Sequence, residues 1–189
     1  MRADEERRRE LAEHRLKLGS RSSRAYRLDD PDIAASLSGS LLHKLQAAGI
    51  SDITKLEEAD ILALGLSEEE LNELLNAIYL AKYLQASPAL MRFLKETGQN
   101  PLTLWKLKYD DVNAMDLSDK LKEELFKHVL TQQRSFVANV EIPTARNIIL
   151  KGWRDENLAF MPRHDARLVT KDFAAKEELN TYIDLLRAG

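Results

Sequence analysis

The sequence predicts an all-α protein with two tandem helical modules, an N-terminal helix and an extended C-terminal arm that ends in a helix. Three observations lead to this fold class. The 189 residues are 44% hydrophobic and 31% charged, a balance typical of globular proteins. Glycine and proline number only 7 and 5, whereas the strong helix formers Leu, Ala, Glu and Lys are abundant. A pattern of apolar and capping residues also occurs twice along the chain. The expected divisions are residues 1–28, 29–87, 88–134 and 135–189.

Composition excludes several classes of function. The chain contains no cysteine, which rules out disulfide frameworks, thiolate zinc sites and cysteine nucleophiles. Its net charge of −3 is not that of a protein that binds polyanions over its whole surface. No apolar run approaches the roughly 18 residues that a membrane helix requires. Because the N-terminus is charged from the start, it is unlike a signal peptide. We therefore expect a cytoplasmic protein with no membrane contact.

The N-terminal segment, residues 1–28, is rich in charged helix formers. Residues 4–18 predict a helix with only a thin apolar stripe, and Gly19 is expected to end it. Serines and arginines then alternate over residues 20–27, which favours a linker. An alternative is a basic arm that docks on an acidic partner or is switched by phosphorylation.

The first module covers residues 29–87. Leucines at helical spacing over residues 41–48 predict a helix, and Gly49 is expected to end it. Short helices are expected around Ile53 and over residues 58–64, before a second glycine. Each of these stretches is too short to bury much surface alone, so they are expected to pack together.

A longer helix is expected to close the first module. Ser67 and Glu70 have the spacing of a capping box, in which each side chain accepts a hydrogen bond from the other residue's backbone N–H. Ser87 and Pro88 mark the end of this helix and the start of the next one, since proline is tolerated at the first helical position.

The second module, residues 88–134, repeats the first. The pattern at residues 41–49 recurs at 90–98, and the pattern at 55–61 recurs at 106–112. Because the order of leucines, glycine, lysine-leucine pair and acidic residue is kept, chance matches between helices are a poor explanation. The sequence predicts two related supersecondary units in tandem.

The last segment, residues 135–189, differs in character. It is strongly apolar but shows no sustained helical period before a final amphipathic helix. This much apolar surface must be buried. We expect an extended arm that lies on a partner in a large assembly, and a cytoskeletal or axonemal host follows as a guess from that architecture. The residues expected to bind protein here are Ile148, Ile149, Leu150, Trp153 and Phe160.

The repeat resembles the sterile alpha motif. Residues 53–66 carry its short helix, acidic residue, aliphatic pair and leucine-glycine-aliphatic stop, and the final helix follows from Ser67. Residues 104–117 are similar but match less closely. The resemblance covers about residues 33–131. The family's first helix with its Trp-Leu pair is not visible, and neither copy has a glycine near the start of the final helix.

The resemblance implies a protein-interaction role. Domains of this family associate with each other or with other proteins through a mid-domain surface and the N-terminal end of the last helix. In the first copy that end is acidic, and residues 31–87 carry a net charge of −6, whereas residues 88–134 carry +1. This difference favours docking between copies, within or between chains. The expected protein-binding residues are Glu68, Glu69 and Glu70 in the first copy and Trp105, Lys106, Lys108 and Tyr109 in the second.

A helix-hairpin-helix module is the alternative, because it shares the leucine-glycine-aliphatic turn before a helix. Such a module binds nucleic-acid phosphate at a helix N-terminus. Here three carboxylates, those of residues 68–70, occupy that position and repel a polyanion. Lys120 and Lys122 offset the acidic residues of the second copy only in part. Nucleic-acid binding is therefore not expected.

Catalytic chemistry is not evident. None of the four histidines has a metal partner at ligand spacing, and the chain has no glycine-rich phosphate loop, nucleophile elbow or calcium loop. We expect a non-catalytic adaptor or structural subunit without a cofactor or metal, in the cytoplasm, with the cytoskeleton or a cilium as candidate hosts. Its expected partners are other proteins in a large complex, or further copies of itself.

Overall fold

A computed structural model describes residues 26–135, 137, 142–153, 158, 161, 181, 183–185 and 188. Within these residues the secondary structure is helical and includes no strand, which confirms the all-α prediction for this part of the chain. The predicted N-terminal helix and Ser/Arg linker up to residue 25 lie outside the described residues, as does most of the predicted terminal helix.

Residues 29–87 contain short helices that lead into a longer one, as expected. Asp30 accepts from the Asp32 N–H and caps the first of them, and Gly49 has a positive φ of 75° where the next one ends. The elements are α2 (Pro31–Ala35), α3 (Gly39–Ala47), the 3-10 helix η1 (Ile53–Lys55), α4 (Glu58–Ala63), α5 (Glu68–Ile78) and the π-helix η2 (Tyr79–Tyr83).

The same order of elements occurs in residues 88–134. A helix, a 3-10 helix, a short helix and a final helix follow one another, as they do from α3 to α5. Gly98 has a positive φ of 68°, which matches Gly49 at the end of the equivalent helix. The elements are α6 (Pro88–Glu96), η3 (Pro101–Lys106), α7 (Tyr109–Asn113) and α8 (Asp119–Gln133).

One side-chain contact is repeated between the two halves. In each half a capping serine donates its backbone N–H to a glutamate of the last helix. Ser38, which caps α3, donates to Glu73 of α5, and Ser87, which caps α6, donates to Glu124 of α8 at 2.9 Å. Asp60 and Asp111 also correspond, since each accepts the backbone N–H three residues earlier, at 3.0 and 2.8 Å. These matched contacts support the predicted duplication.

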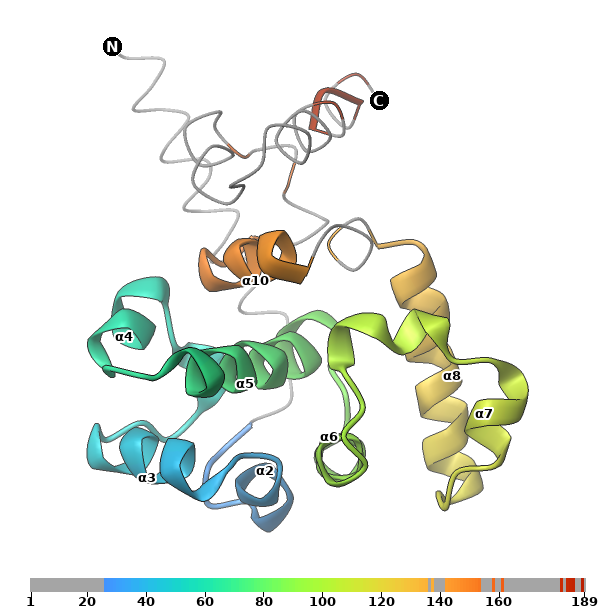
Figure 1. Ribbon diagram of the computed structural model, residues 1–189, viewed down its shortest axis with the longest axis horizontal. Helices are drawn as coiled ribbons and strands as arrows, with labels where there is room; N and C mark the ends of the chain where they lie inside the picture. Colours follow the sequence, from blue (N-terminus) through green and yellow to red (C-terminus); the bar gives the residue numbers. More distant parts are fainter. Residues whose placement is uncertain are drawn as a thin grey trace.

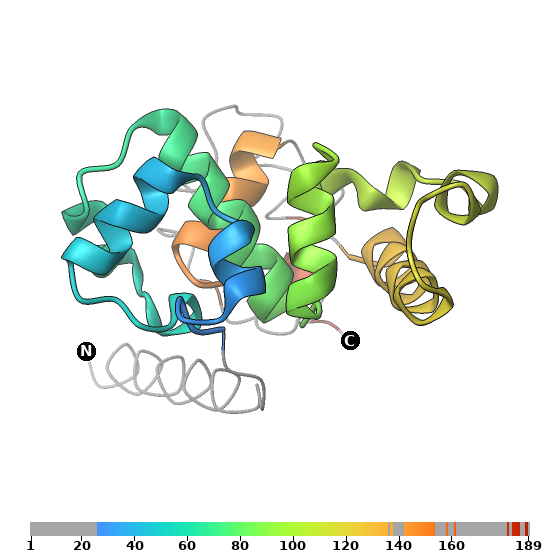
Figure 2. The same cartoon turned by 90° about the horizontal axis from the view of Figure 1, so that it is seen from below.

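The two halves nevertheless share one core. The helix α6 packs against α2, with Arg92 and Asp32 paired at 3.3 Å, and Lys95 reaches Glu73 of α5 at 3.5 Å. Figure 2 shows α6 beside α2, whereas α7 and α8 lie further out. The cluster of buried apolar residues is continuous across the predicted boundary at residue 87. The halves are therefore not separate domains in their packing.

The central element is the rod formed by α5 and the π-helix η2. In Figure 1 it runs between α2, α3 and α6 on one side and an additional helix, α10 (Ile142–Leu150), on the other. The capping box predicted at the start of α5 is confirmed by hydrogen bonds between Ser67 and Glu70 in both directions, at 2.9 and 3.2 Å. The rod is buried along much of its length because helices cover both sides.

The helix α10 corrects the expectation of an extended arm. Residues 142–150 are α-helical and pack against α5. Ile148, Ile149 and Trp153 are buried there, and the Tyr83 hydroxyl donates to the Trp153 carbonyl. The helical period is hard to see in the sequence because the helix is short and two of its four buried residues are Thr144 and Ala145, which are not large apolar residues. Its apolar residues complete the chain's own core.

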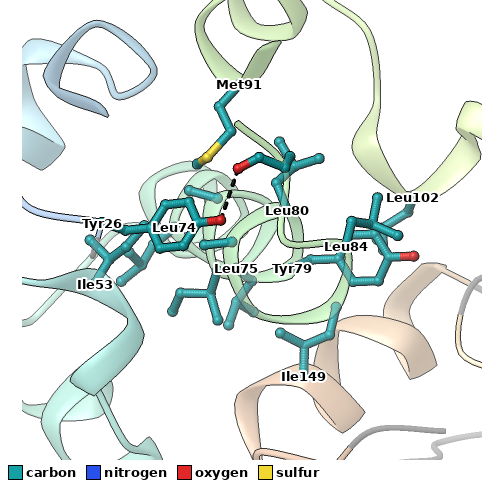
Figure 3. Packing of buried hydrophobic residues seen from close by; sticks show 14 of the residues in the cluster. Tyr26, Ile53, Leu74, Leu75, Tyr79, Leu80, Leu84, Met91, Leu102 and Ile149 are labelled. Carbon is teal, nitrogen blue, oxygen red and sulfur yellow. Dashed lines mark hydrogen bonds between the residues drawn. The ribbon is translucent and has the colours of Figure 1, made fainter. Parts of the chain in front are cut away.

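The core also begins earlier than predicted. Tyr26, which was assigned to the linker, is fully buried and donates its hydroxyl proton to the carbonyl of Ala86 at 2.8 Å. The dashed line in Figure 3 marks this bond, among Leu74, Leu80 and Met91. Residues 26–28 also pair with the backbone at residues 51–53. This short segment therefore belongs to the folded body.

A buried carboxamide joins the two halves at the far end of the rod. Gln132 of α8 is 0% exposed. Its Nε2 donates to the Tyr79 hydroxyl at 3.1 Å and to the Pro101 carbonyl, and its Oε1 accepts from the Trp105 backbone N–H at 2.9 Å. One side chain thus connects the π-helix, η3 and α8.

Replacing this carboxamide should destabilise the protein. Gln132→Ala is expected to lower the free energy of unfolding by about 3 kcal/mol, because the Tyr79 hydroxyl, the Pro101 carbonyl and the Trp105 N–H lose the partner that they share. Chemical denaturation measures the effect. The neighbouring Gln133 is exposed, so Gln133→Ala should change stability by less than about 0.5 kcal/mol. Equal effects of the two substitutions would contradict the role assigned to Gln132.

Truncation of a buried side chain in α10 should show that this helix belongs to the core. Ile148→Ala is expected to cost about 3 kcal/mol of unfolding free energy, since it leaves a cavity against α5. Leu130 is 58% exposed, so Leu130→Ala should cost less than about 0.5 kcal/mol. Thermal and chemical unfolding of both variants provide the comparison, and an unaffected Ile148→Ala variant would mean that α10 is not packed as described.

Candidate functional site

The acidic N-terminal end of α5 contains both exposed and structural carboxylates. Glu68 and Glu69 are exposed, as expected for residues that contact a partner. Glu70 is instead buried, with Lys44 Nζ of α3 at 2.7 Å from its carboxylate and the Ser67 N–H at 2.9 Å. The hydrogen bonds from Lys44 and then Ser67 lower the pKa of Glu70 to about 2. The prediction that Glu70 binds a partner is corrected: it holds α5 to α3.

The adjoining helix α4 carries an exposed leucine. Leu62 is 60% exposed, and Glu57 and Asp60 beside it are exposed as well. Glu58 is engaged within the chain, since Lys151 Nζ lies 3.1 Å from both of its carboxylate oxygens. Leu62 forms one accessible surface of the first half together with four exposed carboxylates, those of Glu57, Asp60, Glu68 and Glu69.

An apolar patch lies on the outer side of the second half. The Tyr109 ring of α7 stacks on Phe126 of α8, with centroids 5.1 Å apart and an interplanar angle of 19°. Tyr109 is 68% exposed, and Leu130 is 58% exposed one helical turn beyond Phe126. We call these three residues the α7–α8 patch. In Figure 1, α7 and α8 lie at the opposite end of the molecule from α4.

Trp105 and its neighbours have separate roles. Trp105 is half-buried, its backbone N–H is bound to Gln132, and its indole Nε1 is buried without a hydrogen-bond partner among the described residues. Lys106 and Lys108 are exposed, with Lys106 Nζ 5.5 Å from the centre of the Trp105 ring. Trp105 thus packs η3 on α8, while the two lysines give a positive charge beside α7.

The residues expected to bind a partner through the C-terminal arm are in the core where the structure describes them. Ile148, Ile149 and Trp153 are buried, and Leu150 is half-buried. Phe160 lies outside the described residues. Exposed apolar residues occur elsewhere, and sequence reasoning missed Leu62 and Leu130 among them, as well as the partly buried Phe126 beside Tyr109. For Phe126 and Leu130, the available signal was their spacing of four residues on the face of α8 away from Leu125 and Val129.

The turns that suggested helix-hairpin-helix modules have their donors engaged. Gly65 has a positive φ of 63°, as such a turn requires. At the helix that follows, however, the Ser67 N–H donates to Glu70. In the second half, Lys122 Nζ donates to the Asn113 carbonyl at 2.9 Å. These contacts use groups that a phosphate would need.

The described residues contain no group of three or more His, Asp or Glu side chains that could hold a metal ion. No helix in the same part of the chain is long and apolar enough to cross a bilayer. Comparisons with family models, with curated proteins and with solved structures gave no match. The features of the chain that bear on its function are the two surfaces described above and the resemblance of the sequence repeat.

The hydrogen bond between Ser87, which caps α6, and Glu124 of α8 should make the free energy of unfolding depend on pH in acidic solution. Burial raises the pKa of Glu124, but hydrogen bonds from His128 and Ser87 outweigh burial and bring it down to about 2. A carboxyl whose folded pKa lies below its unfolded value, about 4.3, stabilises the fold above that value and ceases to do so as pH falls towards 2. The free energy of unfolding should therefore decrease from pH 5 to pH 2, and less steeply in Glu124→Gln.

The neighbouring residue provides a control for that measurement. Glu123 lies on the same helix with its side chain 73% exposed. Glu123→Gln should keep the wild-type slope of stability against pH. A Glu124→Gln variant with the same slope as the wild type would show that this contact does not contribute to acid sensitivity.

Proposed function

We propose that the protein is a non-catalytic interaction adaptor or structural subunit, which binds other proteins through the α7–α8 patch. The exposure of Tyr109 and Leu130 beside Phe126 carries this proposal. Tyrosine is enriched at protein interfaces, where its rigid ring buries a large area with little loss of conformational freedom. Three neighbouring apolar side chains on packed helices suit a preformed docking surface.

The second half offers favourable charges for such a contact. Lys106 and Lys108 are exposed on one side of Tyr109 in sequence, and Asp110 and Asp111 are exposed on the other. The net charge of +1 over residues 88–134 still favours contact with a strongly acidic surface such as that of residues 31–87, net −6. The first half exposes Glu68, Glu69 and Leu62. A chain with a strongly acidic first half and a weakly basic second half can join two proteins, or can associate with further copies of itself. The resemblance to the sterile alpha motif supports the same role.

The described part of the predicted arm does not favour a cytoskeletal or ciliary host. A cytoskeletal or ciliary location was inferred from an extended apolar arm, and α10 packs on the chain's own core. The proposal is therefore an adaptor defined by its surfaces, with no host specified.

Substitutions in the patch test the proposal. Tyr109→Ala and Leu130→Ala should each weaken copurification of partners with the full chain, or its self-association in sedimentation, by at least about fivefold, a loss of about 1 kcal/mol. Lys127 lies on α8 with its side chain 74% exposed, and Lys127→Ala should leave both measurements unchanged. Full association of the Tyr109→Ala variant, with its fold intact by circular dichroism, would argue against the patch.

Charge reversal separates self-association from binding of a different protein. If copies join head to tail, Glu68→Lys should slow association and reduce its salt dependence. The substitution removes attraction between the acidic end of α5 in one copy and the weakly basic second half of the next. It should have little effect on folding, since Glu68 is exposed. Unchanged association of this variant, together with loss in Tyr109→Ala, would indicate a different partner.

The nucleic-acid alternative has a direct test. Binding through the turns would give a salt-dependent mobility shift with short duplex or single strands, and Lys120→Ala with Lys122→Ala would abolish it. We expect no shift at low salt. A shift that these two substitutions remove would favour the helix-hairpin-helix alternative over the adaptor.

A further inference from the structure

A groove of about 440 Å³ lies between α5 and α6, separate from the α7–α8 patch. Its inner wall includes the buried apolar residues Ala77, Leu80, Met91 and Leu94. Leu80 and Met91 lie close together in Figure 3. The volume is within the range of sites that hold small ligands or side chains. The polar lining residues used below are Glu69, Asn72, Glu73, Asn76, Lys95 and Gln99.

The polar wall on α5 has a regular arrangement. Its four side chains occupy positions i, i+3, i+4 and i+7 of the helix, from Glu69 to Asn76, so they lie along one face. At 1.5 Å per helical residue this stripe is about 10 Å long. Three residues of an extended chain span the same distance, at about 3.3 Å each. The stripe therefore matches a short extended peptide in length.

In the described part of the chain the fold does not use the Glu69 carboxylate or Asn76 Oδ1, which both belong to the groove. Glu73 is engaged, since it accepts from the Ser38 N–H and pairs with Lys95 at 3.5 Å. Glu69 forms no ion pair with any described residue. Asn76 Oδ1 is buried without a hydrogen-bond partner in the same part of the chain. A buried acceptor without a donor is unfavourable, so the Asn76 side chain gains a hydrogen bond when it turns toward a ligand that brings a donor to this wall.

The charge and hydrogen-bonding groups define the ligand. Two carboxylates and one ammonium give the groove a net negative charge, which disfavours anions and attracts a cation. Carboxamides such as those of Asn72 and Gln99 both donate and accept, so they can pair with the N–H and C=O of a peptide backbone. A guanidinium offers planar donors to a carboxylate and a carboxamide oxygen at once, which an ammonium cannot do in the same geometry.

We propose that the α5–α6 groove binds a short extended segment of a partner protein that carries an arginine. The peptide backbone lies along the stripe from Glu69 to Asn76 and pairs with the carboxamides, and the arginine side chain reaches the Glu69 carboxylate. This site is additional to the α7–α8 patch and does not depend on it. The two sites would allow the chain to hold two partners at the same time.

A peptide titration tests the proposal with the full-length chain. The probes are two fluorescein-labelled pentapeptides, Gly-Leu-Arg-Leu-Gly and Gly-Leu-Glu-Leu-Gly, with fluorescence anisotropy as the readout of binding. The arginine peptide should bind saturably, and the glutamate peptide should bind at least tenfold more weakly. In nitrogen-labelled protein, the side-chain amide signals of Asn72, Asn76 and Gln99 should shift on addition of the arginine peptide.

Adjacent glutamates give a matched pair of variants. Glu69 lines the groove and Glu68 does not, although both are exposed in the first turn of α5. Glu69→Lys should weaken binding of the arginine peptide at least tenfold, whereas Glu68→Lys should change the affinity for this peptide less than twofold. Asn72→Ala should weaken it as well, without a change in charge.

Three results would overturn the proposal. They are the absence of saturable binding by the arginine peptide, equal effects of Glu68→Lys and Glu69→Lys, and shifts of the groove amide signals with protein concentration alone. The last result would assign the groove to a second copy of the chain. Loss of adaptor function in Tyr109→Ala with intact peptide binding would show that the α7–α8 patch and the groove act independently.

Discussion

The carboxamide of Gln132 sets how the two halves of this protein fit together. It is fully buried and joins the π-helix η2, the 3-10 helix η3 and the end of α8. A neutral side chain with both donor and acceptor atoms is suited to this place, because the three groups that it meets include a hydroxyl, a carbonyl and an N–H. An ion there would carry a large desolvation cost, and an apolar residue would remove the partner that all three groups share.

Local signals in the sequence were good guides to the helices of residues 29–134. These signals are the capping box at Ser67, the glycine at position 49 and the serine before Pro88. Each forms contacts within a few residues, so the helix boundary that it predicts does not depend on the rest of the fold. The repeat could be found for the same reason. Its equivalent caps recur because each begins a helix of the same kind.

Features that depend on distant contacts could not be predicted in this way. Tyr26 looked like part of a linker, yet its partner is Ala86, 60 residues away. Glu70 looked like a surface acid, and its neutralisation by Lys44 depends on how α3 packs on α5. Tyr109 was proposed as a contact residue from its position and is exposed, whereas its support by Phe126 became visible only when α7 was placed on α8. Whether these residues bind a partner stays a prediction.

The π-helix has a consequence for how the chain can vary. A π-turn holds one more residue than an α-turn, and it corresponds to an insertion of one residue into an α-helix. Residues 79–83 lie between the acidic end and the α7–α8 patch. Deleting one of them would return this turn to α-helical geometry, because the wider π-turn takes up the extra residue and leaves the facing of the flanking residues nearly unchanged. The two ends would keep nearly the same relative facing, so chains with and without this residue can share one assembly geometry.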